Sequence, residues 1–120
     1  MHALIIDDSR TTRTIIARLV KGLGYETAEA GDGAAALAHL AQHGAPDLAL
    51  VDWNMPEMNG LEFVQQVRKE PRYDGMQIVM VTSENEMSYV AGALEAGANE
   101  YLMKPFTKDS LAEKIALLNL

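Results

Sequence analysis

The sequence predicts an α/β fold: one sheet of five parallel strands, with five helices covering its faces. Short apolar segments occur five times along the chain, and each is followed by a longer segment whose apolar residues repeat with the period of a helix. Most of the short segments are apolar without strict alternation, which is typical of strands that are buried on both faces of a parallel sheet. This regular succession of strands and helices indicates βαβ units.

The expected strands are short, and residues 3–6 and 78–81 are rich in β-branched residues. They cover residues 3–6, 26–30, 48–51, 78–81 and 100–103. Five apolar stripes predict the helices: Ile15, Ile16, Leu19, Val20 and Leu23; Ala36, Leu37, Leu40 and Ala41; Phe63, Val64 and Val67; Val90, Ala93 and Leu94; Leu111, Ile115 and Leu118. Residues that favour helix starts (Ser9, Asp32, Ser110) and helix ends (Gly22, Gly24, Gly44, Gly97) lie near the ends of these stripes.

Length and composition limit the class of protein. A chain of 120 residues is long enough for one compact domain, and we expect a single domain over residues 1–120. Without cysteine, its chemistry must come from oxygen and nitrogen groups. The net charge of −7 argues against partners with a phosphate backbone or an anionic membrane surface. No apolar run approaches the ~20 residues of a membrane span, and the N-terminus lacks a secretory signal. We therefore expect a cytoplasmic monomer without nucleic-acid or membrane partners.

The residues that follow the expected strands are unusually polar. In an open parallel sheet, ligands bind beyond the carboxyl ends of the strands, so these residues are the candidates for a functional site. If the strand order is 2-1-3-4-5, as in flavodoxin-like sheets, four of these polar ends become neighbours. They consist of Asp7 and Asp8, then Asp52, then Thr82 and Ser83, and finally Lys104 and Pro105.

Three carboxylates that meet at one edge repel one another. At about 5 Å and an effective dielectric constant of about 20, each pair costs on the order of 3 kcal/mol. A cation must therefore lie among them, or some of them must be protonated. A small set of oxygen ligands favours Mg²⁺ over Ca²⁺ or Zn²⁺. Lys104 and the Thr82 hydroxyl would then be available for a phosphoryl group, and carboxylates are known to form aspartyl phosphates.

Four segments at these strand ends carry a family resemblance: LIIDDS, LVDWNMPEMNG, MVTSE and YLMKPF. In this order and spacing they resemble the receiver domains of response regulators in bacterial two-component systems, and most closely the chemotaxis (CheY-like) type. The resemblance covers essentially the whole chain. It implies the flavodoxin-like fold with strand order 2-1-3-4-5, and a signalling switch that catalyses only its own phosphorylation and dephosphorylation.

The resemblance also implies a role for each matching residue. Asp52 would be the phosphoacceptor, with Lys104 and Thr82 as the groups that bind the phosphoryl oxygens. Mg²⁺ would be held directly by Asp8, Asp52 and the backbone carbonyl of Asn54, and through water by Asp7. The Lys104–Pro105 peptide bond would be cis. Ser83 departs from the alanine that is commoner in the family.

The resemblance implies that further residues control effector binding and the lifetime of the acyl phosphate. Tyr101 would turn inward when Thr82 is drawn towards the phosphoryl group, which would change the face made by the fourth helix, fifth strand and fifth helix. An effector protein would bind that face, and a CheA-like histidine kinase would donate the phosphoryl group. Asn54 and Glu84 would control the access of water to the acyl phosphate.

Simpler interpretations stay open for single residues. Asp7 and Asp8 alone would be read as helix caps, and Thr82 or Lys104 alone as ordinary surface or strand residues. His39 and His43 are spaced like a helical metal pair, but surface histidines are the commoner explanation. Three other functions remain as alternatives: a phosphorelay intermediate that passes phosphate to a histidine phosphotransfer protein, a Mg²⁺-dependent aspartyl-phosphate phosphohydrolase, and a receiver excised from a longer regulator.

Overall fold

The computed structural model describes residues 1–120 and has one sheet of five parallel strands in the order β2-β1-β3-β4-β5. This confirms the predicted fold class and strand order. The strands are β1 (His2–Ile6), β2 (Glu26–Ala30), β3 (Leu48–Asp52), β4 (Gln77–Thr82) and β5 (Glu100–Met103). Their bounds differ from the predicted ranges by at most one residue at either end.

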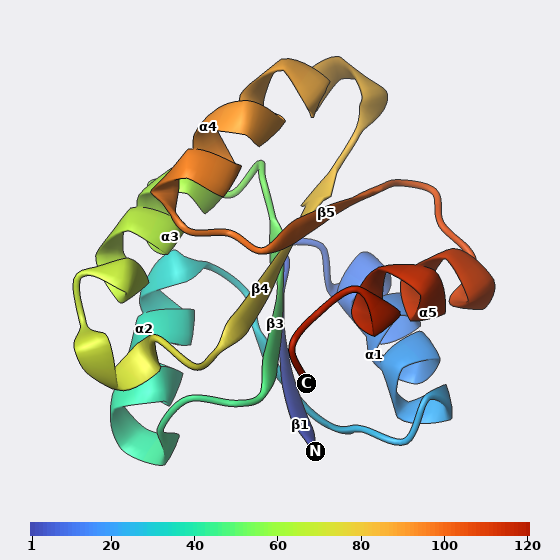
Figure 1. Cartoon of the computed structure of the whole chain (residues 1–120), viewed down its shortest axis with the longest axis horizontal. Coiled ribbons are helices and arrows are strands. Elements are labelled where there is room, and N and C mark those ends of the chain that lie inside the picture. The colour runs from blue at the N-terminus through green and yellow to red at the C-terminus, as the bar shows by residue number, and fades with distance from the viewer.

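Five α-helices cover the sheet. They are α1 (Arg10–Gly22), α2 (Gly33–His43), α3 (Gly60–Arg68), α4 (Val90–Ala96) and α5 (Lys108–Ala116), with two 3-10 helices, η1 (Pro71–Tyr73) and η2 (Glu84–Tyr89). Helices α1 and α5 lie on one face of the sheet, and α2, α3 and α4 lie on the other (Figure 1). No helix combines the length and the apolar character that crossing a bilayer requires.

The core is divided by the sheet into two apolar clusters. Eighteen buried residues, centred on Phe63, Val64 and Met80, fill the space under α2, α3 and α4. Ten others, including Ile16, Val20 and Leu111, pack between the sheet and α1 and α5. All five residues of β3 are buried, as expected for a central strand with helices on both sides.

Polar residues fix the helix starts. Ser9 caps α1 by accepting a hydrogen bond from the Thr12 amide, and Asp32 caps α2 in the same way with Ala35. For α5 the cap is Thr107, and Ser110 completes a capping box three residues later. Ser110 is therefore inside the first turn of α5, although it lies near the helix start as predicted.

Three members of the apolar stripes are exposed. Ile15 is 54% exposed, Leu94 is also exposed, and Ala41 faces solvent. Each is the first or the last residue of its predicted stripe. The side chain of Ile15 instead borders a shallow groove between α1 and the segment Lys104 to Phe106.

Candidate functional site

The register of the strands brings the predicted site residues to one edge of the sheet. Asp52 is the last residue of β3 and pairs with Val81 of β4, and Thr82 at the end of β4 pairs with Met103 of β5. Asp7 follows β1, which lies next to β3, and Lys104 follows β5. The ends of four strands are thus adjacent, as the sequence predicted from strand order.

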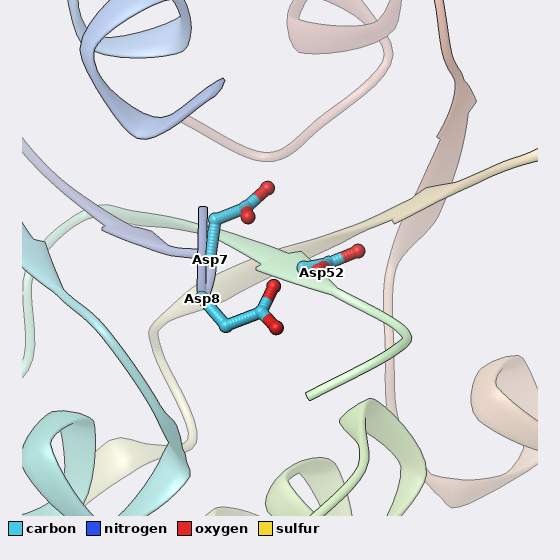
Figure 2. Close-up of side chains that lie close together, drawn as sticks. All are labelled: Asp7, Asp8 and Asp52. Atoms are coloured by element: carbon cyan, nitrogen blue, oxygen red, sulfur yellow. The ribbon is translucent and has the colours of Figure 1, made fainter. Parts of the chain in front are cut away.

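The carboxylates of Asp7, Asp8 and Asp52 converge at this edge (Figure 2). One oxygen from each lies within 4.8 Å of the others. Asp7 is 1% exposed and Asp52 is 5% exposed, whereas Asp8 is open to solvent. Two of the three negative charges are therefore held away from water, where their mutual repulsion is least screened.

Lys104 supplies the positive charge that faces the buried pair. Its Nζ lies 3.1 Å from Asp52 Oδ1 and 3.4 Å from Asp7 Oδ2. The Lys104–Pro105 peptide bond is cis. Burial by itself lowers the pKa of Lys104, but the two carboxylates outweigh it, and the pKa lies above its ordinary value. The ammonium group stays charged at neutral pH.

The single ammonium group of Lys104 does not fully offset the cost of burying the negative charge of Asp52. The pKa of Asp52 is raised from 3.8 to about 6. Burial is the largest cause and Asp7 adds to it, whereas Lys104 and a backbone hydrogen bond at Asn54 act in the opposite direction. The site without a bound cation therefore resists ionisation of Asp52. Any additional positive charge at this edge would favour the ionised carboxylate.

The donor set fits Mg²⁺. It consists of carboxylate oxygens from the ends of two neighbouring strands, and it contains no sulfur or imidazole ligand. Hard oxygen ligands in small number, one of them on an exposed side chain, suit an ion that retains several water molecules. The excess negative charge of the cluster favours a divalent cation.

Hydrogen bonds from Ser9 and from Arg13 of α1 hold Asp7 in place. The Asp7 carboxylate accepts a hydrogen bond from the Ser9 amide at 2.8 Å. Arg13 donates from Nη1 to the Asp7 backbone carbonyl at 2.8 Å, and its Nε lies 3.1 Å from Glu29 on β2. Arg13 could not be predicted as a site residue, since one arginine among the polar residues of an amphipathic helix gives no signal of its own.

Gly60 allows the loop after β3 to approach the start of α3. Its amide donates to the Trp53 carbonyl at 2.8 Å. A Cβ atom at this position would lie 3.0 Å from both the Asp52 carbonyl oxygen and the Trp53 Cα, and 2.5 Å from the Met80 side chain. Only a residue without a side chain therefore fits next to Asp52 at this position.

The hydroxyl group of Thr82 has a weak partner. It is buried, and its Oγ1 donates to Met87 Sδ at 3.8 Å. Thioether sulfur is a poor acceptor, so the hydroxyl can exchange this contact for a better one at small cost. Trp53, directly after Asp52, stacks on Tyr89 at the end of η2, with ring centroids 4.7 Å apart and an interplanar angle of 8°.

The remaining predicted residues lie around this centre. Asn54 is exposed in the loop that follows β3, and Glu84 is exposed at the start of η2. Tyr101 on β5 is half-buried, and the Nζ of Lys114 lies 4.2 Å from the centre of its ring. The same ammonium group pairs with Glu100 at 3.2 Å.

The fold and the acidic edge are the features of a signalling receiver domain. The family described as the response regulator receiver domain matches residues 3–116. The chain belongs to this family.

Similar proteins indicate which type of receiver domain this chain is. A chemotaxis protein CheY homolog of Campylobacter jejuni is 45% identical over 116 residues, which cover 96% of this chain and 89% of the homolog. Chemotaxis protein CheY1 of Helicobacter pylori is 42% identical over 119 residues, covering 98% and 96%. The solved structure of response regulator CheY4 of Vibrio cholerae has a TM-score of 0.87 at 35% identity and covers 98% of both chains. The chain is a receiver domain of the CheY type.

Proposed function

We propose that residues 1–120 act as a single-domain response regulator, phosphorylated on Asp52 by a CheA-like histidine kinase in a Mg²⁺-dependent reaction. The observation that carries the proposal is the buried Asp52 carboxylate, which faces the Lys104 ammonium group at 3.1 Å within a cluster of three carboxylates. A carboxylate held in this way is a nucleophile with a cation beside it for the incoming negative charge.

Four residues would hold the metal ion. Asp8, Asp52 and the backbone carbonyl of Asn54 would bind it directly, and Asp7 through water. The bound ion would neutralise the carboxylates and withdraw charge from the phosphoryl oxygens. Arg13 and Ser9 would keep Asp7 in position through the hydrogen bonds that they donate to it.

The Asp52 carboxylate is the nucleophile in the phosphoryl transfer. One of its oxygens attacks the phosphorus atom of a phosphohistidine, the new P–O bond forms, and the P–N bond breaks with its electron pair leaving on the imidazole. Lys104 faces a phosphoryl oxygen with a positive charge that is already in place, so no reorganisation is needed during the reaction. The product is an aspartyl phosphate.

Thr82 and Tyr101 would transmit the phosphorylation of Asp52 to the α4-β5-α5 face. The Thr82 hydroxyl would leave the weak Met87 contact and donate to a phosphoryl oxygen, and Tyr101 would turn towards the space that Thr82 vacates. Tyr101 lies on the α4-β5-α5 face, where Leu94 and Met103 are exposed apolar residues. That face would bind the effector protein.

The exposed positions of Asn54 and Glu84 support a chemotaxis-type control of lifetime. Both side chains are exposed, and each lies two residues after the last residue of its strand, Asp52 of β3 or Thr82 of β4. They would orient or block the water molecule that hydrolyses the acyl phosphate. Fast loss of the phosphoryl group is the expected consequence.

The test is to incubate the protein with Mg²⁺ and acetyl phosphate and to follow its mass and its Trp53 fluorescence. The expected result is the gain of one phosphoryl group, which Asp52→Asn abolishes and Asp109→Asn, an exposed carboxylate on α5, leaves intact. Phosphorylation of Asp52→Asn to the same extent would refute the assignment of the phosphoacceptor. Steady release of phosphate from a metabolite would instead indicate a phosphohydrolase.

A further inference from the structure

All three histidines of the chain line one cavity. The cavity has a volume of about 320 Å³ and lies between the first residues of β1 and β2 and the last turn of α2. His2 comes from β1, and His39 and His43 come from α2. Figure 1 shows the start of β1 and the end of α2 towards the same end of the molecule. This is the amino edge of the sheet, opposite the carboxylate cluster, so the two sites are separate.

The side chains that line the cavity include four of the kinds that bind transition metals, His2, Glu26, His39 and His43. His39 and His43 are one helical turn apart, and the centres of their rings are 4.5 Å from each other, with the planes tilted by 38°. Glu26, at the start of β2, places a carboxylate oxygen 3.1 Å from the Nδ1 of His2. The side chains of His2 and Glu26 are 68% and 77% exposed, so both are free to rotate towards the helical pair.

The chemistry of this set selects the metal. Imidazole nitrogen is a ligand for zinc, nickel and copper, whereas Mg²⁺ prefers oxygen. Three imidazoles and one carboxylate are the number and kind of ligands that a four-coordinate zinc ion accepts. At pH 7.5 most imidazole groups are neutral, as metal binding requires.

The positions of the three histidines in the sequence support a metal site in this cavity. The helical pair alone has an ordinary explanation as two surface histidines. However, the third histidine lies 37 residues or more away along the chain and still reaches the same cavity. We propose that His2, His39 and His43, together with Glu26, form a binding site for a divalent transition-metal ion of the zinc class, independent of the magnesium site.

The experiment uses the full chain without a polyhistidine tag, because a tag would bind the same ions. ZnCl₂ is titrated by calorimetry in excess Mg²⁺, which occupies the carboxylate cluster, and the imidazole signals are followed by ¹H–¹⁵N NMR. The expected result is one zinc ion per chain, with all three imidazole signals moving together. His39→Gln, His43→Gln and His2→Gln should each lower the zinc affinity roughly tenfold or more. Asp8→Asn, at the opposite edge, is the matched control and should leave it unchanged.

Three results would overturn the proposal. Zinc affinity that survives in His43→Gln would exclude the helical pair, and affinity that is lost in Asp8→Asn would move the ion to the carboxylate cluster. An unchanged affinity in His2→Gln, with an unmoved His2 signal, would show that the cavity does not act as one site. The NMR measurement on the unmodified protein decides the last point without any variant.

Discussion

Replacing Asp52 with asparagine should stabilise the metal-free protein at neutral pH. Burial raises the pKa of Asp52 to about 6, whereas the unfolded chain titrates near 3.8. The folded protein therefore binds this proton more tightly than the unfolded chain does. Its stability must fall as the pH rises between these two values, since ionising Asp52 favours unfolding.

The magnitude follows from the same two values. The interval from 3.8 to about 6 corresponds to about 3 kcal/mol, at about 1.4 kcal/mol for each pH unit. Asp52→Asn cannot ionise, so it should be more stable than the parent protein by about 3 kcal/mol above pH 6. Because Asp52 is 5% exposed, solvent screening reduces this figure little.

Urea unfolding in the presence of EDTA, at several pH values from 4 to 8, measures the difference. The advantage of Asp52→Asn should be small near pH 4, grow through pH 5 and level off above pH 6. Glu113→Gln, which removes an exposed carboxylate on α5, is the matched control. A difference between Asp52→Asn and the parent that stays constant over this range would refute the reasoning, and so would one that shrinks as the pH rises.

Four other changes test the surroundings of Asp52. Lys104→Ala leaves two buried carboxylates without their partner, so it should destabilise the metal-free protein by about 1–3 kcal/mol in urea and retain Mg²⁺ binding in a fluorescence titration; an unchanged unfolding midpoint would contradict the ion pair. Gly60→Ala should cost about 1–3 kcal/mol and weaken Mg²⁺ binding, because its Cβ would press on the Asp52 backbone; a fully stable variant would mean that the loop adapts. Arg13→Gln should lose about 1–2 kcal/mol of stability and reduce Mg²⁺ affinity by a few fold, and wild-type affinity would show that Asp7 needs no such support. Tyr101→Ala should impair effector binding more than phosphorylation by acetyl phosphate, whereas equal losses would count against its role as a switch.

Much of the fold could be predicted because each strand carries its own signal. The burial of β3 on both faces follows from its uninterrupted apolar residues, and the end of β5 follows from the change to Lys104 and Pro105. Exposure at the edge of a stripe could not be predicted in the same way. Ile15 has the spacing of a core residue, but its side chain is 54% exposed and borders the groove next to Lys104 and Phe106.

The candidate site was predictable where its residues end a strand. Asp52, Thr82 and Lys104 occupy such positions, and the strand order brings them together. Contacts that depend on the direction of a side chain could not be predicted from the sequence. The hydrogen bond from Arg13 to the Asp7 carbonyl is of this kind, and so is the position of His2 in one cavity with the histidines of α2.

The stacking of Trp53 on Tyr89 affects how the optical signal of this protein is to be interpreted. The indole ring adjoins Asp52 in the chain, but its aromatic neighbour belongs to η2, and Tyr89 is 50% exposed. A change in emission therefore mixes two events, the arrival of charge beside the carboxylate and the displacement of the neighbouring helix. Comparing the parent with Tyr89→Leu would separate the electrostatic contribution from the conformational one.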